Sequence, residues 1–343
     1  MSKFLFRAAA ICVPAMFLAA CGGGGGDDGD GGGLSSGVVI TTANAKAVSA
    51  DALDASTNLG AAANSGLVVG VQVDATGLSA SPMRLYAAAR TFTRMPVPPA
   101  LATGAAVTGN CSLGGTLTLD GQVQDSSGNT LNTGDWLSIS ANNCRENVDG
   151  AVVTMNGRMR IDVLRGPYTA NSSSYPKSVS MKITATQFSM VENGVTMSSN
   201  GDMTVDLTET SATASVGTVT SSSLTNTTSS GAGSRSTTLK NYAQKSSVTA
   251  SGTSIEVSGS VETNNSRLGV GTKLYTIKTI APITMTASGD FTGGTLEVVG
   301  ANATALRLTV TGTNTFGIAI DADGNGSFES SATATRSELA ALL

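Results

Sequence analysis

The amino-acid sequence predicts a mainly β protein of the α+β class, in which Ala-rich N-terminal helices pack on a large antiparallel β-meander. Two observations predict this class. From about residue 105 onward, apolar residues alternate with Thr, Ser and charged residues in many short runs, whereas residues 34–104 are rich in alanine and lack that alternation. A period of two is typical of strands with one buried and one solvated face. Either a curved open barrel or a two-sheet sandwich accommodates such a meander.

The first twenty residues are predicted to be an export signal. Lys3 and Arg7 precede an apolar stretch that ends in small residues, which is the order of a secretory signal peptide. The stretch is shorter than the ~20 apolar residues that span a bilayer.

The end of this segment resembles a motif of a known family. Leu18-Ala19-Ala20-Cys21 is similar to the lipobox of bacterial lipoprotein precursors. The resemblance implies that residues 1–20 are removed and that Cys21 becomes the first residue, held in the membrane by acyl chains such as palmitate. In the enterobacterial form of that family's sorting rule, an aspartate after the cysteine retains the protein at the inner membrane, so Gly22 at this position points to the outer membrane. We therefore expect the membrane as a partner, with the body facing the periplasm or the cell surface.

Residues 21–33 are predicted to be the lipidated cysteine and a flexible tether. Glycine resists ordering, and the aspartates in this run repel one another. The twelve residues after Cys21 have a typical end-to-end distance of about 20 Å.

Segment 34–104 is predicted to be helical. Thr42 to Ala55 contains good helix formers without strand alternation. Ser81-Pro82 is typical of the start of a second helix, which Pro96 ends. Gly66 to Ala75, between the two helices, is predicted to be a strand or a buried connector.

Residues 105–343 are predicted to form the antiparallel β domain. Asn156-Gly157, Asn193-Gly194 and Asn200-Gly201 each lie between alternating runs. Because both residues of an Asn-Gly pair accept positive φ, these three pairs predict hairpin turns.

Two further features complete the β domain. The Ser- and Thr-rich stretch 208–236 is predicted to be a long surface loop, or a seam at which two β halves meet. Thr335 and Glu338 have the spacing of a capping box and predict a short last helix.

Composition excludes several function classes. The chain contains no histidine, so Ser-His-Asp and Cys-His catalysis lack their base. Removing Lys3 and Arg7 from the 20 basic residues leaves 18 against 24 acidic ones, a net charge of −6. This balance argues against nucleic acid as a partner. No catalytic residue is predicted.

Cys111 and Cys144 are predicted to form a disulfide. They remain as an even pair once Cys12 leaves with the signal peptide and Cys21 is lipidated, and the periplasm is oxidising. A redox-active pair is the alternative, but the two lack a C-x-x-C arrangement.

The stretch DADGNGSFE is the candidate metal site. Asp321, Asp323 and Asn325 stand at positions one, three and five of a calcium loop, but Ala332 occupies position twelve, where a bidentate glutamate is needed. We predict a β-hairpin turn stabilised by local hydrogen bonds. Weak calcium binding is the alternative, and no other cofactor is expected.

Two patterns resemble catalytic arrangements. Ser174 and Lys177 match S-x-x-K, but Pro176 argues against the helical turn that this chemistry requires. Asp162, Asp202 and Asp206 can be imagined as carboxylates for sugar hydrolysis. Strand alternation instead places them on a solvated face.

The sequence predicts a non-catalytic envelope lipoprotein that binds an apolar ligand or an envelope partner in the curve of its sheet. Methionines recur on the apolar side of the alternating runs, and methionine suits adaptable binding surfaces as well as ordinary cores. The alternative is a structural or adhesive surface lipoprotein with Ser/Thr-rich β faces. A dry cavity lined by methionine favours the first function, and a filled core favours the second.

Overall fold

The computed structural model describes residues 36–64, 106–125, 130–148, 151–169, 172–231 and 233–343, with the side chains of the first helix described as far as Thr57. Cys21, its tether and the predicted second helix therefore lie outside the described residues, as does the predicted connector at 66–75.

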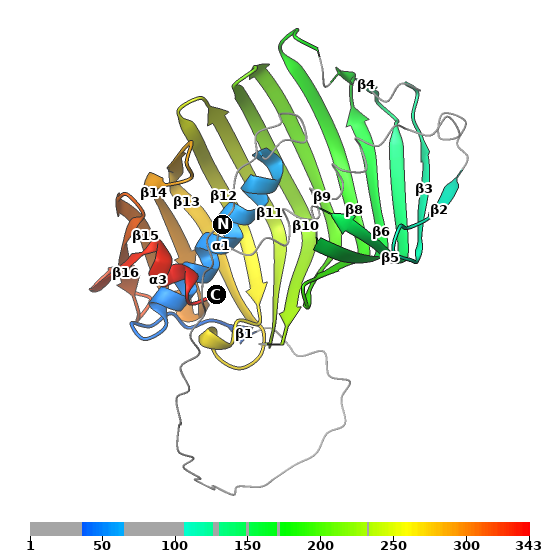
Figure 1. Ribbon diagram of the computed structural model, residues 1–343. Helices are drawn as coiled ribbons and strands as arrows, with labels where there is room; N and C mark the ends of the chain where they lie inside the picture. The colour runs from blue at the N-terminus through cyan, green and yellow to red at the C-terminus, as the bar shows by residue number, and fades with distance from the viewer. Residues whose placement is uncertain (1–35, 65–105, 126–129, 149–150, 170–171, 232) are drawn as a thin grey trace, which may run out of the picture. The chain divides into compact units, whose positions relative to one another are not determined.

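The fold is a single large antiparallel sheet of 15 strands that does not close into a barrel (Figure 1). Strands β2 to β17 follow one another across the sheet almost in sequence order, so the predicted meander is confirmed and the two-sheet sandwich is not formed. β1 is the exception, since it pairs in parallel with β13. β4 and β7 form a separate two-stranded sheet.

The strands are β1 (Ser36–Gly37), β2 (Val107–Asn110), β3 (Thr116–Gln122), β4 (Thr130–Leu131), β5 (Trp136–Val148), β6 (Ala151–Arg165), β7 (Tyr168–Thr169), β8 (Lys177–Glu192), β9 (Val195–Ser211), β10 (Ala214–Ser230), β11 (Gly233–Thr249), β12 (Gly252–Thr263), β13 (Lys273–Thr286), β14 (Phe291–Val299), β15 (Ala305–Gly312), β16 (Thr315–Asp321) and β17 (Ser330–Thr335). The helices are α1 (Ala45–Asn64), α3 (Arg336–Ala340) and the 3-10 turns η2 (Ser266–Leu268) and η3 (Ala301–Ala303).

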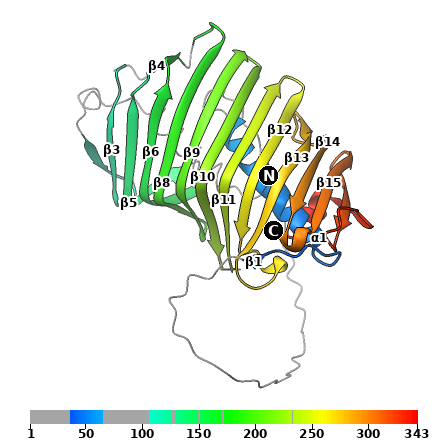
Figure 2. The ribbon, with the colours of Figure 1, turned by 180° about the vertical axis from the view of Figure 1, so that it is seen from behind.

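Helix α1 packs on one face of the sheet, as the two opposite views show (Figures 1 and 2). Its contacts concentrate on β10, β11 and β12, and it also meets β14, β15 and β16. Leu53 and several alanines of α1 join the alternating apolar residues of β6 to β16 in one continuous core. The predicted helix at Thr42 to Ala55 is confirmed, as is the last helix, because Thr335 and Glu338 form the expected capping box at α3.

A row of β-bulges bends the strands at a common level. Register shifts occur in six strand pairs between β5 and β13. They fall around Asn143, Gln187, Ser222, Asn241 and Val257. Because a bulge bends its strand and increases the local twist, aligned bulges fold the whole sheet along one line. We call this line the crease.

Glycines opposite the bulges allow the strands to approach. Gly157 and Gly201 have φ of 88° and 126°, and a Cβ on either would lie 2.1 Å from the carbonyl oxygen of the bulged neighbour, Gln187 or Ser223. Only glycine fits such a site.

Two of the three predicted Asn-Gly turns are therefore wrong. Asn156-Gly157 and Asn200-Gly201 lie inside β6 and β9. Each asparagine Oδ1 accepts a hydrogen bond from the backbone N–H of a bulged residue, Asn143 at 2.8 Å for the first and Gln187 at 3.1 Å for the second. Only the glycine of each pair has positive φ, and it faces a bulge on the neighbouring strand instead of forming a turn. Asn193-Gly194 does form the turn between β8 and β9, with both φ positive.

The expected surface loop at 208–236 is also wrong, because this stretch contains the end of β9, all of β10 and the start of β11, and the sheet continues through it without a seam. Val219 and Leu224 are buried in the core, and the surrounding threonines are good strand formers. Because the stretch is so rich in serine, its alternation of buried and solvated strand residues was not recognised in the sequence.

We expect Gly157→Ala to destabilise the protein more than Gly194→Ala does. Both glycines have positive φ, which costs alanine about 1–2 kcal/mol. At Gly194 no atom lies within 4 Å of the added Cβ, whereas at Gly157 the new methyl meets the Gln187 carbonyl. Urea unfolding of the two variants measures the difference, and equal losses would contradict a role for the crease in stability.

Candidate functional sites

A buried polar cluster joins α1 to the sheet. Asp51 has no exposed surface, and its carboxylate accepts a hydrogen bond from the Tyr275 hydroxyl at 2.6 Å. Arg235 of β11 lies 2.6 Å from Asp51 and 3.0 Å from Asp54. Asn265 donates to Asp51 at 3.3 Å. The cluster is a two-carboxylate clasp around one guanidinium.

The surroundings of the clasp keep the Arg235 guanidinium charged and the Tyr275 hydroxyl protonated. Burial opposes the charge of Arg235, but Asp51 and Asp54 outweigh it, so the pKa of Arg235 rises above its ordinary value. Burial and the negative charge of Asp51 raise the pKa of Tyr275 well above its ordinary value, so its hydroxyl remains a donor. Arg235 therefore stays a cation and Tyr275 a hydrogen-bond donor within the clasp.

A second buried ion pair lies where β8 begins. Lys177 Nζ lies 3.3 Å from Glu209, which also accepts from the Tyr168 hydroxyl at 3.2 Å. The ammonium lies 4.8 Å from the ring centroid of Tyr175. Burial raises the pKa of Glu209. Lys177 is thus engaged by a carboxylate and aromatic rings, and Ser174 hydrogen-bonds through its backbone N–H to Ser172.

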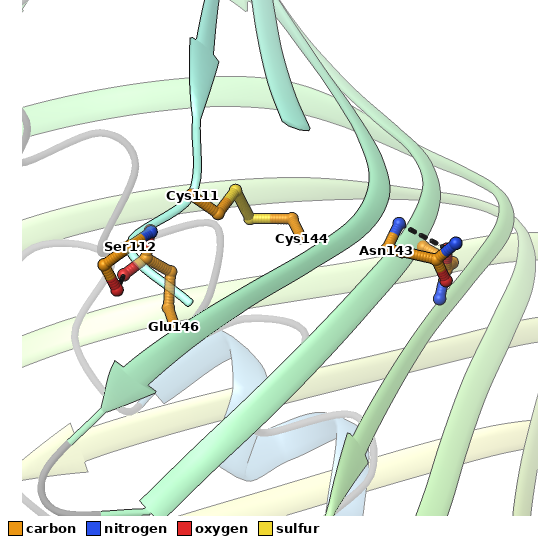
Figure 3. The surroundings of a disulfide bond; sticks show 6 residues. Cys111, Ser112, Asn143, Cys144 and Glu146 are labelled. Atoms are coloured by element: carbon orange, nitrogen blue, oxygen red, sulfur yellow. Dashed lines mark hydrogen bonds between the residues drawn. A yellow bond between two sulfur atoms is a disulfide. The ribbon is translucent and has the colours of Figure 1, made fainter. Parts of the chain in front are cut away.

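Cys111 and Cys144 form the predicted disulfide (Figure 3). The bond ties the turn between β2 and β3 to β5, in a small core of its own that includes Ile139 and Met155. Beside it, Glu146 accepts from the backbone N–H of Ser112 at 2.8 Å. The bridge fastens one edge of the sheet, together with backbone hydrogen bonds that join Leu113 and Gly114 to Arg145.

The DADGNGSFE stretch forms the hairpin loop between β16 and β17, as predicted. Asp321 is buried and accepts from the backbone N–H groups of Gly324, Asn325 and Gly326. Burial opposes its ionisation, but these three donors outweigh it and lower the pKa of Asp321. Carboxylate oxygens of Asp321, Asp323 and Glu329 lie within 4.8 Å of one another and are the oxygen ligands that calcium takes. The sequence had offered Asn325 in place of Glu329.

The solvated face of the sheet changes character at the crease. Toward the β9–β10 turn, Asp162, Asp202 and Asp206 lie on the outer face, opposite the buried methionines, as alternation predicted. Each has a cationic partner: Arg160 for Asp162, Lys182 for Asp202 and Arg165 for Asp206. Paired surface carboxylates are explained by solvation and ion pairing.

Trp136 pairs with Asp162 and lies on this charged part of the outer face, opposite the face on which Ile139 is buried. Its ring is half-buried and carries the Arg160 guanidinium 4.2 Å from the ring centroid. The ring face is therefore already occupied by a cation.

On the other side of the crease, β9, β10 and β11 present an uncharged polar array. The register aligns nine residues in three rungs on the outer face: Thr196, Ser229 and Ser234; Ser198, Thr227 and Ser236; and Asn200, Thr225 and Thr238. Hydroxyl pairs join β10 to β11 in every rung, at 2.8 to 3.1 Å. We call these nine residues the hydroxyl array. Sequence analysis missed it because the five array residues from Thr225 to Ser236 were assigned to a loop and Asn200 to a turn.

The methionines are core residues. Met159, Met181 and Met203 are buried on the inner face of β6, β8 and β9 and belong to the same core as α1. Aromatic and aliphatic side chains fill the rest of this face, with Tyr242, Phe188 and Phe291 each almost fully buried.

Comparisons with family models, curated proteins and solved structures found no match to this chain. Within the described residues, no helix is long and apolar enough to span a bilayer. The fold and the sites therefore have to be interpreted on their own chemistry.

Arg235→Met should cost about 3–5 kcal/mol of stability, because it leaves Asp51 and Asp54 buried without their cation. The matched control is Arg165→Met, which breaks the exposed pair with Asp206 and should cost about 1 kcal/mol or less. Urea unfolding at neutral pH measures both. Similar small losses would contradict the clasp.

Proposed function

We propose that the protein is a non-catalytic, lipid-anchored protein of the bacterial envelope that acts through the polar outer face of its sheet, as a structural or adhesive surface protein. The lipobox-like sequence ending in Cys21 supports the anchor and, with Gly22, an outer-membrane location.

One observation favours the outer face of the sheet over the inner face as the binding surface. The inner face of the sheet is packed against α1 in one continuous core, and its methionines are buried. A filled core favours a protein that binds its partners through the outer face of the sheet. The outer face is wide and polar, and the crease divides it into a charged part and the hydroxyl array.

The hydroxyl array suits a repeating, uncharged partner. Within one rung, residues on neighbouring strands are about 4.8 Å apart, and successive rungs are about 6.8 Å apart along the strands. Hydroxyls both donate and accept, and the nine residues carry no charge. Glycan polymers offer hydroxyls and amides at regular intervals, so an envelope polysaccharide is the partner class that the array fits.

A second candidate function is supported by the position of the methionines. Figure 1 shows α1 over the strands from β10 toward β16, whereas Met159, Met181 and Met203 belong to β6, β8 and β9. Methionine repacks easily. An apolar ligand or envelope partner in the curve of the sheet is therefore the alternative, in which flexible side chains make room.

Cys21→Ser should abolish acylation, because an oxygen atom in place of sulfur cannot form the thioether that carries the lipid. Metabolic labelling with a palmitate analogue measures this directly, with the wild-type protein as the positive control. Absence of label from the wild type, or label in the variant, would refute the anchor.

Thr227→Lys should abolish co-sedimentation of the detergent-solubilised full chain with purified peptidoglycan sacculi, because it places a charge at the centre of the hydroxyl array. The matched control is Thr309→Lys, which alters a cross-strand hydroxyl pair with Thr295 on distant strands. The control should bind as the wild type does.

Two results would contradict the outer-face function. One is that the wild-type protein does not bind sacculi at all, and the other is that Thr227→Lys and Thr309→Lys reduce binding equally. Saturable binding of a lipophilic probe that lipid displaces, lost in Met159→Gln/Met203→Gln with the fold intact, would favour the inner-face function instead.

A further inference from the structure

Three exposed valines lie at the end of the sheet where β13 begins and β14 ends. Val270 is 97% exposed, in the loop between η2 and β13. Val39 and Val299 are 43% and 36% exposed. Large apolar side chains at such exposure need a reason when several occur together at one place.

Backbone hydrogen bonds bring these three valines to one rim. Ser36 N–H donates to the Thr272 carbonyl at 3.1 Å, and Val38 N–H to that of Leu274 at 2.9 Å, so β1 lies beside the Val270 loop. The Val38 carbonyl accepts from Ala301 N–H at 2.7 Å, which brings the end of β14 to the other side of β1.

The Val270 loop is built to project. Leu268 is buried and fixes the start of the loop, while Gly269 and Gly271 on either side of Val270 have φ of 112° and 77°. Those backbone angles turn the chain sharply outward and back. The exposed Arg267 and the half-buried Lys273 flank the loop, and Lys273 Nζ donates to Ser36 Oγ at 3.1 Å.

We propose that this rim, formed by Val39, Val270 and Val299 with Arg267 and Lys273, rests on the lipid surface that holds the anchor. The inference rests on the proposed lipidation of Cys21. Fourteen residues separate Cys21 from Ser36, and a chain of that length and composition spans about 20 Å on average. The lipid surface is therefore the partner that the anchor holds nearest to the rim.

The chemistry of the rim fits the boundary between headgroups and acyl chains. Branched apolar side chains enter that boundary, and basic side chains pair with lipid phosphates. Asp323 and Glu329 lie on the neighbouring hairpin loop, which packs against η3 through Gly324. These acids offset the basic pair, so apolar contact rather than net charge carries the association. The rim would hold the body in one orientation on the membrane, which attachment through Cys21 alone does not do.

A tryptophan placed on the rim tests the contact. The full-length lipidated chain carries Trp136→Phe, which removes its only tryptophan, together with Val270→Trp. The matched control carries Val216→Trp instead, on an exposed valine where β10 begins, at the opposite end of the strands. Both are reconstituted into vesicles of phosphatidylethanolamine and phosphatidylglycerol with brominated acyl chains, and emission is compared with that in unbrominated vesicles.

We expect several-fold stronger quenching at position 270 than at position 216. Equal or absent quenching in chains that float with the vesicles would overturn the rim contact and leave the anchor standing. A chain that carries no acyl label and does not float would overturn the anchor and the rim together.

Discussion

The fold depends on a geometric constraint: a sheet of 15 strands with one apolar face must bend if a single helix is to lie within its curve. The crease supplies the bend. Bulges at residues such as Asn143 and Gln187 turn the strands, and glycines on the facing strands let the displaced carbonyls in. Continuous strands of up to 17 residues thus serve two surfaces that meet at an angle. The same line divides the solvated face into chemically different parts.

The clasp around Arg235 fixes the position of α1 on the curved sheet. An Ala-rich helix offers little shape to recognise, and apolar packing alone would allow α1 to slide or rotate. Two carboxylates and one guanidinium, all buried, have few arrangements without an unpaired charge. We infer that the clasp contributes position more than stability, since a well-packed apolar substitute can be equally stable.

Local chemistry was predictable from the sequence, but its long-range use was not. Period two identified the strands, and the acceptor geometry of Asp321 follows from a local loop. Asn156-Gly157 has the composition of a turn, and only the opposing Gln187 carbonyl makes it a bulge site. Likewise, nothing in the predicted helix at Thr42 to Ala55 distinguishes Asp51 from the other polar residues. Its meaning lies in Arg235, on a strand that no spacing rule connects to it.

The meander has a consequence for the order of folding. Nearly every strand pairs with its neighbour in sequence, so the sheet can grow one hairpin at a time. Helix α1 is the exception. It is synthesised early, yet its anchoring partners Arg235 and Tyr275 follow 184 and 224 residues later. During synthesis the carboxylates of α1 therefore lack their partners until the later strands have been made. An alanine-rich helix has few large apolar side chains through which it could aggregate, so it is well suited to that delay.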